Sequence, residues 1–481
     1  MAPTHDYQFR GWPLTRGLAE ALRGTADLLG ARRLWRQGTS FCSACSRVAA
    51  SLGVLVITST SLPLVLKGAR QTGKTHILKR FGEKEFSRLV YLDLQKDPGL
   101  HAIFDGDLTP ARVVEAIEFA TGTPLNTQAD LLFLDEAQEC SRALTSLKYF
   151  SEQMPELAVC AAGSLLGVTH PESPFPVGKV TFLQLNPMSF EEFLLAIGEQ
   201  QAYEVLVKTT GPGPLGALYH RRLLELLREY FVVGGMPEVV AAYASQRKQK
   251  LTAFGTARSL QRDLLMAFIS DFAKYSGKVN ATAITSTFES IPGQLARVNK
   301  KFRASAAVKG GRFSRLSGAI DWLVGAGLAL KVKIANSGEL PFSAFTNDNR
   351  FKLYLFDTGL LGALARLSPA AIYQATEPFA TFRGAFCENY VAQEFIYSGC
   401  DALYAWSGNT AEVEFLREVE GEVCPVEVKA GLSGKLKSLA IFAQRYPIRH
   451  RVRISARDLE INHQSGMHSY PLYLTHRFPL A

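Results

Sequence analysis

The stretch PLVLKGARQTGKTHILKRFG at residues 63–82 carries the pattern from which the fold can be predicted. An apolar run at Leu64–Leu66 leads into Gly68–Thr75, which fits GxxxxGK(S/T) at every position. A loop of this kind between a buried strand and a helix wraps phosphates, because its glycines allow a tight backbone path and the amides at the helix start point at anionic oxygens. In this pattern Lys74 reaches the terminal phosphates and the Thr75 hydroxyl binds Mg²⁺. We expect a site for ATP and Mg²⁺ formed by Gly68, Ala69, Arg70, Gln71, Thr72, Gly73, Lys74 and Thr75.

Two acidic residues end a second apolar run, DLLFLDE at residues 130–136. The run predicts a buried strand with Asp135 and Glu136 at its carboxyl end, which is the edge where open α/β sheets bind ligands. We expect Asp135 to hold Mg²⁺ together with Thr75. Glu136 is expected to act as a catalytic residue beside Lys74, orienting and deprotonating the attacking water.

Strands and helices alternate along this part of the chain. Ser164 ends a predicted strand, LAVCAAGS at residues 157–164. It is either a further catalytic residue that senses the γ-phosphate or a serine in an ordinary turn, and both interpretations remain open. The alternation predicts the parallel sheet of an α/β P-loop NTPase, followed by a helical lid. Further strands are expected at 89–94 and 179–185, and helices at 110–120, 190–197 and 221–231.

Seven motifs together resemble one family: GARQTGKT, LLFLDEAQE, CAAGSLLG, FPVGKV, NPMSFEEFL, VGGMPEVV and FKLYLFDTGLL. From about residue 62 to about residue 440 the chain is similar to the prokaryotic AAA+-like ATP-binding proteins that carry a C-terminal domain of unknown function. The resemblance implies an ATPase domain, a winged-helix region and a C-terminal restriction-endonuclease-like fold. We expect a basic, poorly ordered extension at 1–60, a P-loop ATPase core at 61–185, a helical lid and connector at 186–275, a winged-helix region at 276–350 and an α/β nuclease-like domain at 351–481.

Composition narrows the class of protein. The net charge of +9 favours anionic partners such as ATP or nucleic acid. Seven scattered cysteines do not form a disulfide framework and indicate a reducing, cytoplasmic compartment. The Cys42–Cys45 pair lacks the second pair that a zinc site needs.

The uncharged run Val48–Leu66 is long enough to span a membrane, but its end must form the strand before the phosphate loop, so we expect no membrane span.

The segment 291–320 has no Asp or Glu but seven basic residues, namely Arg297, Lys300, Lys301, Arg303, Lys309, Arg312 and Arg315. A helix is predicted at 314–326, and strands at 328–334 and 340–345 flank Asn336-Ser-Gly, a hairpin signal. Helices followed by such a hairpin are typical of a winged helix, which binds DNA or RNA through one helix and its wing. The alternative is a module that packs on the ATPase or binds a protein partner. Oligomer formation also remains open.

The C-terminal segment AEVEFLREVEGEVCPVEVK, residues 411–429, predicts a hairpin that turns at Glu420-Gly421. In that register Glu414 faces Glu427 and Glu412 faces Lys429. Alternation puts the apolar residues on the opposite, core side: Val413, Phe415, Val426 and Val428.

The charged face of this hairpin resembles the PD-(D/E)xK nuclease core. Glu427 and Lys429 would form its second half, with Glu388 as the upstream acid, whereas Glu414 stands where that motif has Asp. Three interpretations remain open. The face is a second, metal-dependent site, an inactive nuclease-like binding fold, or a solvated surface neutralised by Glu412 and Lys429.

We therefore expect an ATPase that couples its nucleotide state to a winged-helix and nuclease-like C-terminal half. One alternative is a nucleotide-dependent switch or regulator that binds nucleic acid and turns over little ATP. The other is a metal-dependent nuclease gated by ATP.

Overall fold

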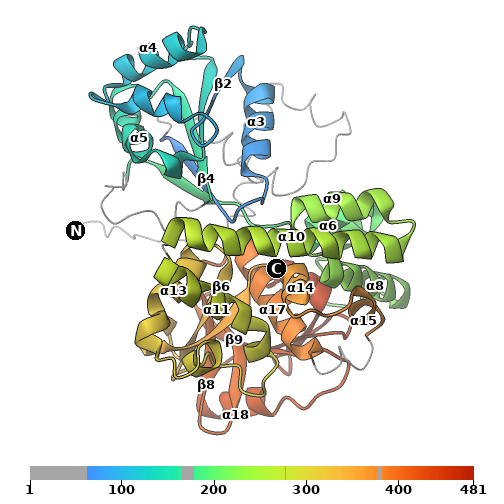
Figure 1. Ribbon diagram of the computed structural model, residues 1–481. Coiled ribbons are helices and arrows are strands. Elements are labelled where there is room, and N and C mark those ends of the chain that lie inside the picture. The colour runs from blue at the N-terminus through green and yellow to red at the C-terminus, as the bar shows by residue number, and fades with distance from the viewer. Residues whose placement is uncertain (1–61, 165–177, 277, 376–381, 481) are drawn as a thin grey trace, which may run out of the picture. The chain divides into compact units, whose positions relative to one another are not determined.

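A computed structural model describes residues 62–164, 178–276, 278–375 and 382–480 (Figure 1). The expected N-terminal extension, the Cys42–Cys45 pair and the start of the apolar run at 48–66 lie outside the described residues. Within the described ranges, no helix is both long and apolar enough to cross a membrane.

The first sheet has five parallel strands in the order β2-β3-β4-β1-β5. Its strands are β1 (Leu64–Lys67), β2 (Arg88–Asp93), β3 (Asp130–Asp135), β4 (Ala158–Gly163) and β5 (Thr181–Gln184). The expected parallel α/β sheet is confirmed. Because β4 lies between β1 and β3, the loop after β1 and the acids after β3 flank the end of β4 at one edge of the sheet.

Both faces of this sheet are covered, which explains why β3 is buried along its whole length and apolar between its two terminal aspartates. Leu132 and Leu134 join a core that includes residues of α4 and α5, whereas Leu131 and Phe133 join a core that includes residues of α3. Figure 1 shows α3 on one side of the sheet and α4 and α5 on the other. The helices are α3 (Lys74–Glu85), η2 (Pro98–Phe104), α4 (Pro110–Thr121), η3 (Ala137–Glu139) and α5 (Ser141–Gln153).

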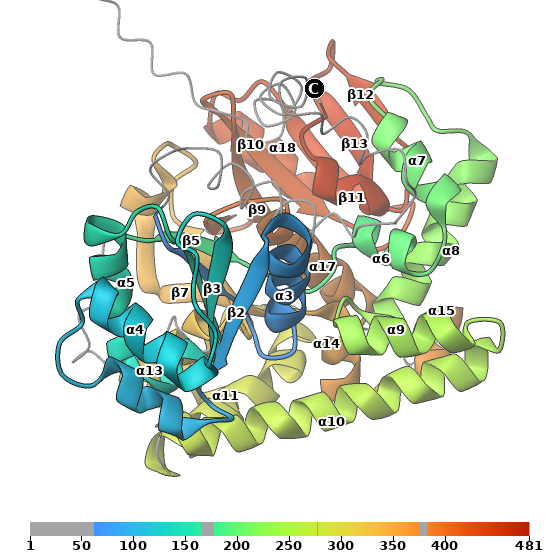
Figure 2. The ribbon, with the colours of Figure 1, turned by 90° about the horizontal axis from the view of Figure 1, so that it is seen from above.

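The middle of the chain is helical, as expected. Ser189 begins α6 with a reciprocal capping box, in which Ser189 and Glu192 satisfy each other's backbone amides. The helices are α6 (Phe190–Ala196), α7 (Gln200–Lys208), α8 (Ala217–Val233), α9 (Pro237–Gln246), α10 (Lys250–Ser276), α11 (Lys278–Leu295), α12 (Ala304–Ala307) and α13 (Phe313–Gly325). Figure 2 shows α10 as one long helix.

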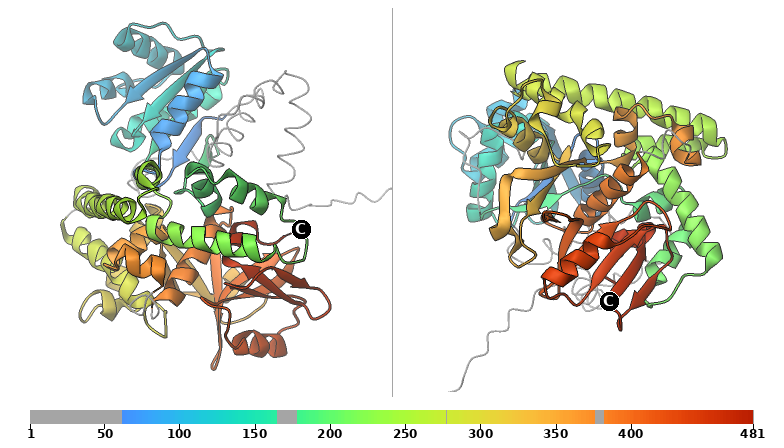
Figure 3. Two further views of the ribbon diagram at one scale, coloured as in Figure 1. Left: turned by 90° about the vertical axis from the view of Figure 1, so that its right-hand side faces the viewer. Right: turned by 90° about the horizontal axis from the view of Figure 1, so that it is seen from below.

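The second sheet is mixed and has eight strands in the order β12-β13-β11-β10-β9-β8-β6-β7. Its strands, several of which are seen side by side in Figure 3, are β6 (Ala329–Ala335), β7 (Thr346–Leu355), β8 (Leu403–Ser407), β9 (Glu412–Val419), β10 (Glu422–Val428), β11 (Arg451–Ser455), β12 (Glu460–Asn462) and β13 (Met467–Pro471). The remaining helices are η4 (Phe342–Phe345), α14 (Thr358–Leu364), α15 (Pro369–Gln374), α17 (Arg383–Tyr397), α18 (Lys437–Arg445) and η5 (Leu472–Arg477).

One predicted strand is wrong. Residues 340–345 form part of a loop and η4, and the partner of β6 is β7, which begins at Thr346. The turn after Asn336 is therefore longer than a tight hairpin. Since β6 also pairs with β8, the hairpin β6–β7 is the edge of the eight-stranded sheet, and the expected limit at residue 350 falls inside β7.

Candidate functional site

The phosphate loop leaves β1 along a path that only glycine can follow. A Cβ atom on Gly68 would lie 2.3 Å from the Leu185 carbonyl oxygen, at a contact between backbone segments. Gly73 adopts φ 95° and forms the N-cap of α3, a left-handed conformation that other residues rarely adopt. The two glycines of the motif are thus required by close approach and by backbone geometry, respectively.

Lys74 is buried and turned onto its own loop. Its Nζ donates to the carbonyl oxygens of Gly68 at 3.1 Å and Ala69 at 2.8 Å. The Thr72 hydroxyl donates to the same Ala69 oxygen at 2.9 Å. Burial lowers the pKa of Lys74 to about 8, although the nearby carboxylates of Glu136 and Asp135 oppose this shift. The ammonium group is therefore close to both acids of the predicted site.

Asp135 lies next to the phosphate loop. Its carboxylate accepts hydrogen bonds from the Thr75 side chain and, at 3.0 Å, from the Tyr91 hydroxyl. Burial raises the pKa of Asp135, while these hydrogen bonds act in the opposite direction. Tyr91 also donates to Asp93 at 3.1 Å. Thr75 and Asp135, the two residues predicted to coordinate Mg²⁺, are therefore joined by a hydrogen bond.

Glu136 follows Asp135 in a left-handed conformation, with φ 49°. Non-glycine residues rarely adopt this region, and such strained positions cluster at functional sites. The Glu136 carboxylate accepts a 2.5 Å hydrogen bond from the Gln138 side chain. Backbone conformation and Gln138 thus orient the side chain that was predicted to activate water.

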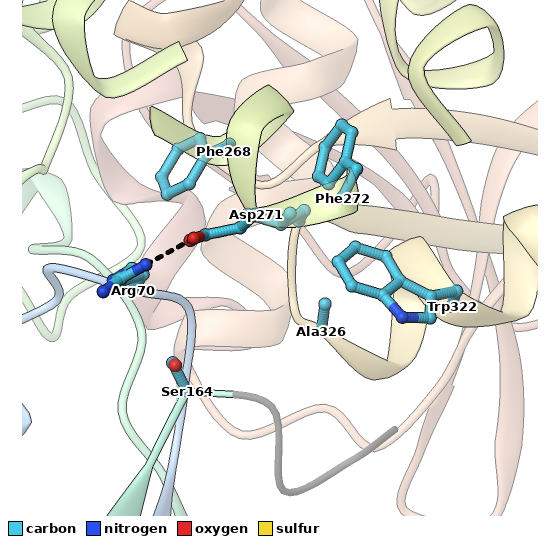
Figure 4. Close-up of a pocket in the computed structure, with 8 residues that line it drawn as sticks. Arg70, Ser164, Phe268, Asp271, Phe272, Trp322 and Ala326 are labelled. Carbon is cyan, nitrogen blue, oxygen red and sulfur yellow. Dashed lines mark hydrogen bonds and ion pairs between the residues drawn. The ribbon is translucent and has the colours of Figure 1, made fainter. Parts of the chain in front are cut away.

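Ser164 ends β4 and is buried, with 8% of its surface exposed. It lines a small pocket together with Arg70 of the phosphate loop and Asp271 of α10, as Figure 4 shows. The pocket is completed by Phe268, Phe272, Trp322, Ala326 and Leu328. Ser164 thus lies beside the phosphate loop, because β4 is located between β1 and β3 in the sheet.

The oxygen donors fit Mg²⁺. This ion prefers hydroxyl and carboxylate oxygens and takes few protein ligands, because phosphate oxygens and water complete its shell. Thr75 and Asp135 supply one hydroxyl and one carboxylate. Across the described residues, no group of three or more His, Cys, Asp or Glu side chains could hold a metal ion.

The C-terminal hairpin has the predicted register. Val426 pairs with Phe415 and Glu422 with Val419, so Glu427 and Glu414 are one step beyond the last paired residues. The apolar side chains assigned to the core side are all buried: Val413, Phe415, Val426 and Val428.

The structure does not contain the Glu412–Lys429 ion pair on which the interpretation as a solvated, self-neutralised surface depended. Lys429 pairs with Glu427 at 2.6 Å, and Glu412 pairs with Lys352 of β7. β10 ends at Val428, and the Lys429 amide donates to the Ile454 carbonyl oxygen of β11 at 2.9 Å. Lys429 thus pairs with an acid of β10, and Glu412 pairs with a lysine from β7.

The charged face is also not a solvated surface. Glu427 is 2% and Lys352 1% exposed. Burial raises the pKa of Glu414, and the neighbouring Glu388 carboxylate raises it further. Glu388 in turn pairs with Lys300 and accepts a 3.0 Å hydrogen bond from Tyr354. The four residues of the predicted second site, Glu388, Glu414, Glu427 and Lys429, therefore belong to one network of buried and half-buried acids and lysines.

Several residues of these sites were not predicted. For Tyr91 and Lys352 the sequence does contain a usable pattern. Alternation along LVYLDL and FKLYLF places each of them on the same face of its strand as another polar residue. Asp271 has no such pattern, since it is 201 residues from Arg70. Lys300 and Lys301 were expected in a nucleic-acid surface, but they contact Glu388 and Ser407.

Comparison with known proteins supports this description of the first sheet. Residues 60–194 match the model of a family described as an AAA domain. This part of the chain is therefore similar to AAA domains, and its parallel sheet fits the P-loop NTPase fold. Residues 224–371 and 383–474 match two further families, each described as a domain of unknown function. No curated protein matches the chain.

Similar solved structures include the Walker-type ATPase PABY2304 of Pyrococcus abyssi, with 15% identity and a TM-score of 0.42, covering 69% of this chain and 97% of that one. The Aeropyrum pernix ORC1 protein in complex with DNA has 12% identity and a TM-score of 0.29, covering 67% of this chain and 91% of that one.

Proposed function

We propose that the AAA-type domain binds Mg-ATP at Gly68–Thr75 and hydrolyses it. One observation carries this proposal. The phosphate loop, the Thr75–Asp135 contact and the strained Glu136 all lie at the carboxyl edge of one parallel sheet. This combination provides an anion cradle, oxygen ligands for Mg²⁺ and a carboxylate that can accept a proton from water.

Each residue has a distinct role in the proposed reaction. Lys74 exchanges its contacts with the Gly68 and Ala69 carbonyl groups for the terminal phosphates, whose charge it neutralises. Asp135 and Thr75 would hold Mg²⁺, which supplies further neutralisation of phosphate charge when bound. Glu136 orients and deprotonates water, with its carboxylate held by Gln138.

Two substitutions test the proposal. Lys74→Ala should abolish binding of a fluorescent ATP analogue. Glu136→Gln should retain binding but lower turnover by about 10²–10⁴-fold, which is the usual contribution of a general base. Glu115→Gln removes an exposed carboxylate from α4 and serves as the matched control. Turnover of Glu136→Gln equal to that of Glu115→Gln would refute the assignment of the base.

We further propose that the nucleotide state is coupled to a winged helix formed by α11, α12, α13 and the β6–β7 hairpin. The element order is that of a winged helix, in which a helix and a hairpin contact nucleic acid. Five exposed basic side chains of this segment make no ion pair with any described residue: Arg297, Arg303, Lys309, Arg312 and Arg315. These support a second candidate function, a nucleotide-dependent regulator that binds DNA or RNA.

Binding to DNA and RNA at two salt concentrations separates this function from protein binding. Arg312→Ala/Arg315→Ala should weaken binding and reduce its salt dependence, because each lost phosphate contact lowers the number of released counterions. Arg221→Ala/Arg228→Ala removes two exposed arginines from α8 and is the matched control. Equal binding by the two double variants would favour a protein partner for this segment.

A nuclease receives less support. In the C-terminal network each of Glu388, Glu412 and Glu427 is paired with a lysine, which leaves these carboxylates neutralised without a metal. We therefore favour an inactive nuclease-like fold over cleavage. Degradation of a plasmid or RNA with Mg²⁺ or Mn²⁺ that is lost in both Glu427→Ala and Lys429→Ala would reverse this preference.

A further inference from the structure

Helix α10 contacts the phosphate loop through Asp271. The Arg70 guanidinium donates to the Asp271 carboxylate, and Figure 4 shows the two side chains pointing at each other beside Ser164. Arg70 is 34% and Asp271 16% exposed at the side chain, so the pair is partly shielded from water. A residue of the phosphate loop is thus bonded to a helix outside the first sheet.

A second ion pair joins α10 to the segment that follows Glu136. Lys274 lies one helical turn after Asp271, and its ammonium group is 3.4 Å from the Glu139 carboxylate. Glu139 belongs to η3, three residues after Glu136. Asp271 and Lys274 therefore attach α10 to both halves of the proposed ATP site, with opposite charges.

The same turn of α10 is packed into the C-terminal half through aromatic rings. Phe272 makes edge-to-face contacts with Trp322 of α13 at 5.2 Å and with Phe288 of α11 at 5.6 Å between ring centroids. Phe268 contacts Phe356 at 6.0 Å. A shift of this turn therefore disturbs α11 and α13, because close-packed rings cannot absorb it locally.

Carboxylates and phosphates present similar oxygens to a guanidinium group and bind it with the same geometry. We propose that Asp271 and the phosphates of bound ATP compete for Arg70, so that ATP binding detaches α10 from the phosphate loop. Asp271 is then a positioning residue that links the nucleotide state to the C-terminal half. The coupling is reciprocal: the factor by which ATP binding weakens the Arg70–Asp271 pair equals the factor by which this pair weakens ATP binding. Loss of the Asp271 charge should therefore tighten ATP binding. The proposal rests on the proposed ATP binding.

A double-mutant cycle tests the competition with a non-hydrolysable ATP analogue and the full chain. Asp271→Asn should tighten binding by about two- to fivefold, the range expected for a partly exposed ion pair. In the Arg70→Gln background, the same substitution should leave the Kd unchanged. Asp263→Asn removes an exposed carboxylate from the same helix and should have no effect in either background.

Hydrogen exchange of the amides at residues 262–274 provides a second readout. In the wild type, the analogue should raise the exchange rate of these amides. In Asp271→Asn, exchange should already be raised and should not respond further.

Equal tightening in both backgrounds would indicate simple loss of negative charge and would overturn the competition. Unchanged exchange in the wild type on saturation would also overturn it, while ATP binding itself would stand. A wild type that does not bind the analogue would overturn both proposals.

Discussion

The Gly235 amide donates a 2.6 Å hydrogen bond to the carboxylate of Asp357, 122 residues further along the chain. Asp357 is fully buried, and it also caps α14 by accepting a 2.8 Å bond from the Leu360 amide. The Gly235 carbonyl oxygen accepts a 2.8 Å bond from the Met188 amide. Three motifs of the sequence, NPMSFEEFL, VGGMPEVV and FKLYLFDTGLL, therefore meet at one backbone junction.

Gly235→Ala should destabilise this junction. A Cβ atom at Gly235 would lie 2.1 Å from the Met188 carbonyl oxygen, which is backbone and cannot move aside cheaply. We expect a loss of about 1–3 kcal/mol in the free energy of unfolding, as for other overpacked sites. Thermal unfolding measures the change. Gly255→Ala in α10 is the control, because its Cβ would meet no atom within 4 Å and alanine favours helix. Equal melting temperatures of the two variants would contradict the prediction.

Asp357 should make stability depend on pH. Burial raises its pKa from 3.8 to about 6, so the folded state binds the proton more tightly than the unfolded state. Its contribution is therefore fully present below the unfolded pKa and is lost as pH rises through the folded pKa, with a size on the order of 3 kcal/mol. Between about pH 4 and about pH 7, the denaturant midpoint of the wild type should therefore fall relative to that of Asp357→Asn, whose amide does not titrate. Parallel curves would exclude this titration.

Lys74 should make ATP affinity depend on pH in alkaline solution. Burial lowers its pKa to about 8, and binding to phosphates requires the charged form. The Kd should stay constant near neutral pH and rise above about pH 8, approaching tenfold per pH unit. Binding in that range should also take up a proton, which calorimetry in two buffers detects. If Lys74→Arg binds ATP, its Kd should not rise there, because arginine stays charged. A wild-type Kd that remains flat to about pH 9.5 would refute the role of the Lys74 charge.

Lys352→Met should destabilise the C-terminal network. The substitution leaves Glu412 without its partner and removes the positive charge that favours ionised Glu414. Removing one member of a buried pair costs about 3–5 kcal/mol, whereas replacing both members is often nearly neutral. Lys352→Met/Glu412→Gln should therefore recover most of the loss in a urea titration. Lys208→Met breaks an exposed pair with Glu204 and is the control. A loss no larger than that of Lys208→Met would show that the network contributes little.

Local pattern was sufficient for much of the architecture. The strands at 89–94, 130–136 and 157–164 were predicted to within a residue or two of β2, β3 and β4, because each is a short, largely apolar run between turns. The hairpin register at Glu420-Gly421 also followed from alternation and turn position alone. By contrast, the second strand of the β6 hairpin was misplaced, since pairing across a long turn has no local signal.

The same contrast between local and long-range signals explains why the ATP site could be predicted from the sequence and the ion pairs of the C-terminal site could not. Gly68–Thr75 and Asp135-Glu136 are short patterns whose chemistry depends on neighbours in sequence, so the sequence alone was enough to predict the ATP site. The acids that pair with Lys352 and Lys300, the arginine that pairs with Asp271 and the Gly235 amide that binds Asp357 lie between 60 and 201 residues away in the sequence. Long-range packing sets which charges are buried together, and burial sets whether an acid on a strand is a solvated side chain or one member of an ion pair. Only the folded chain could supply that information.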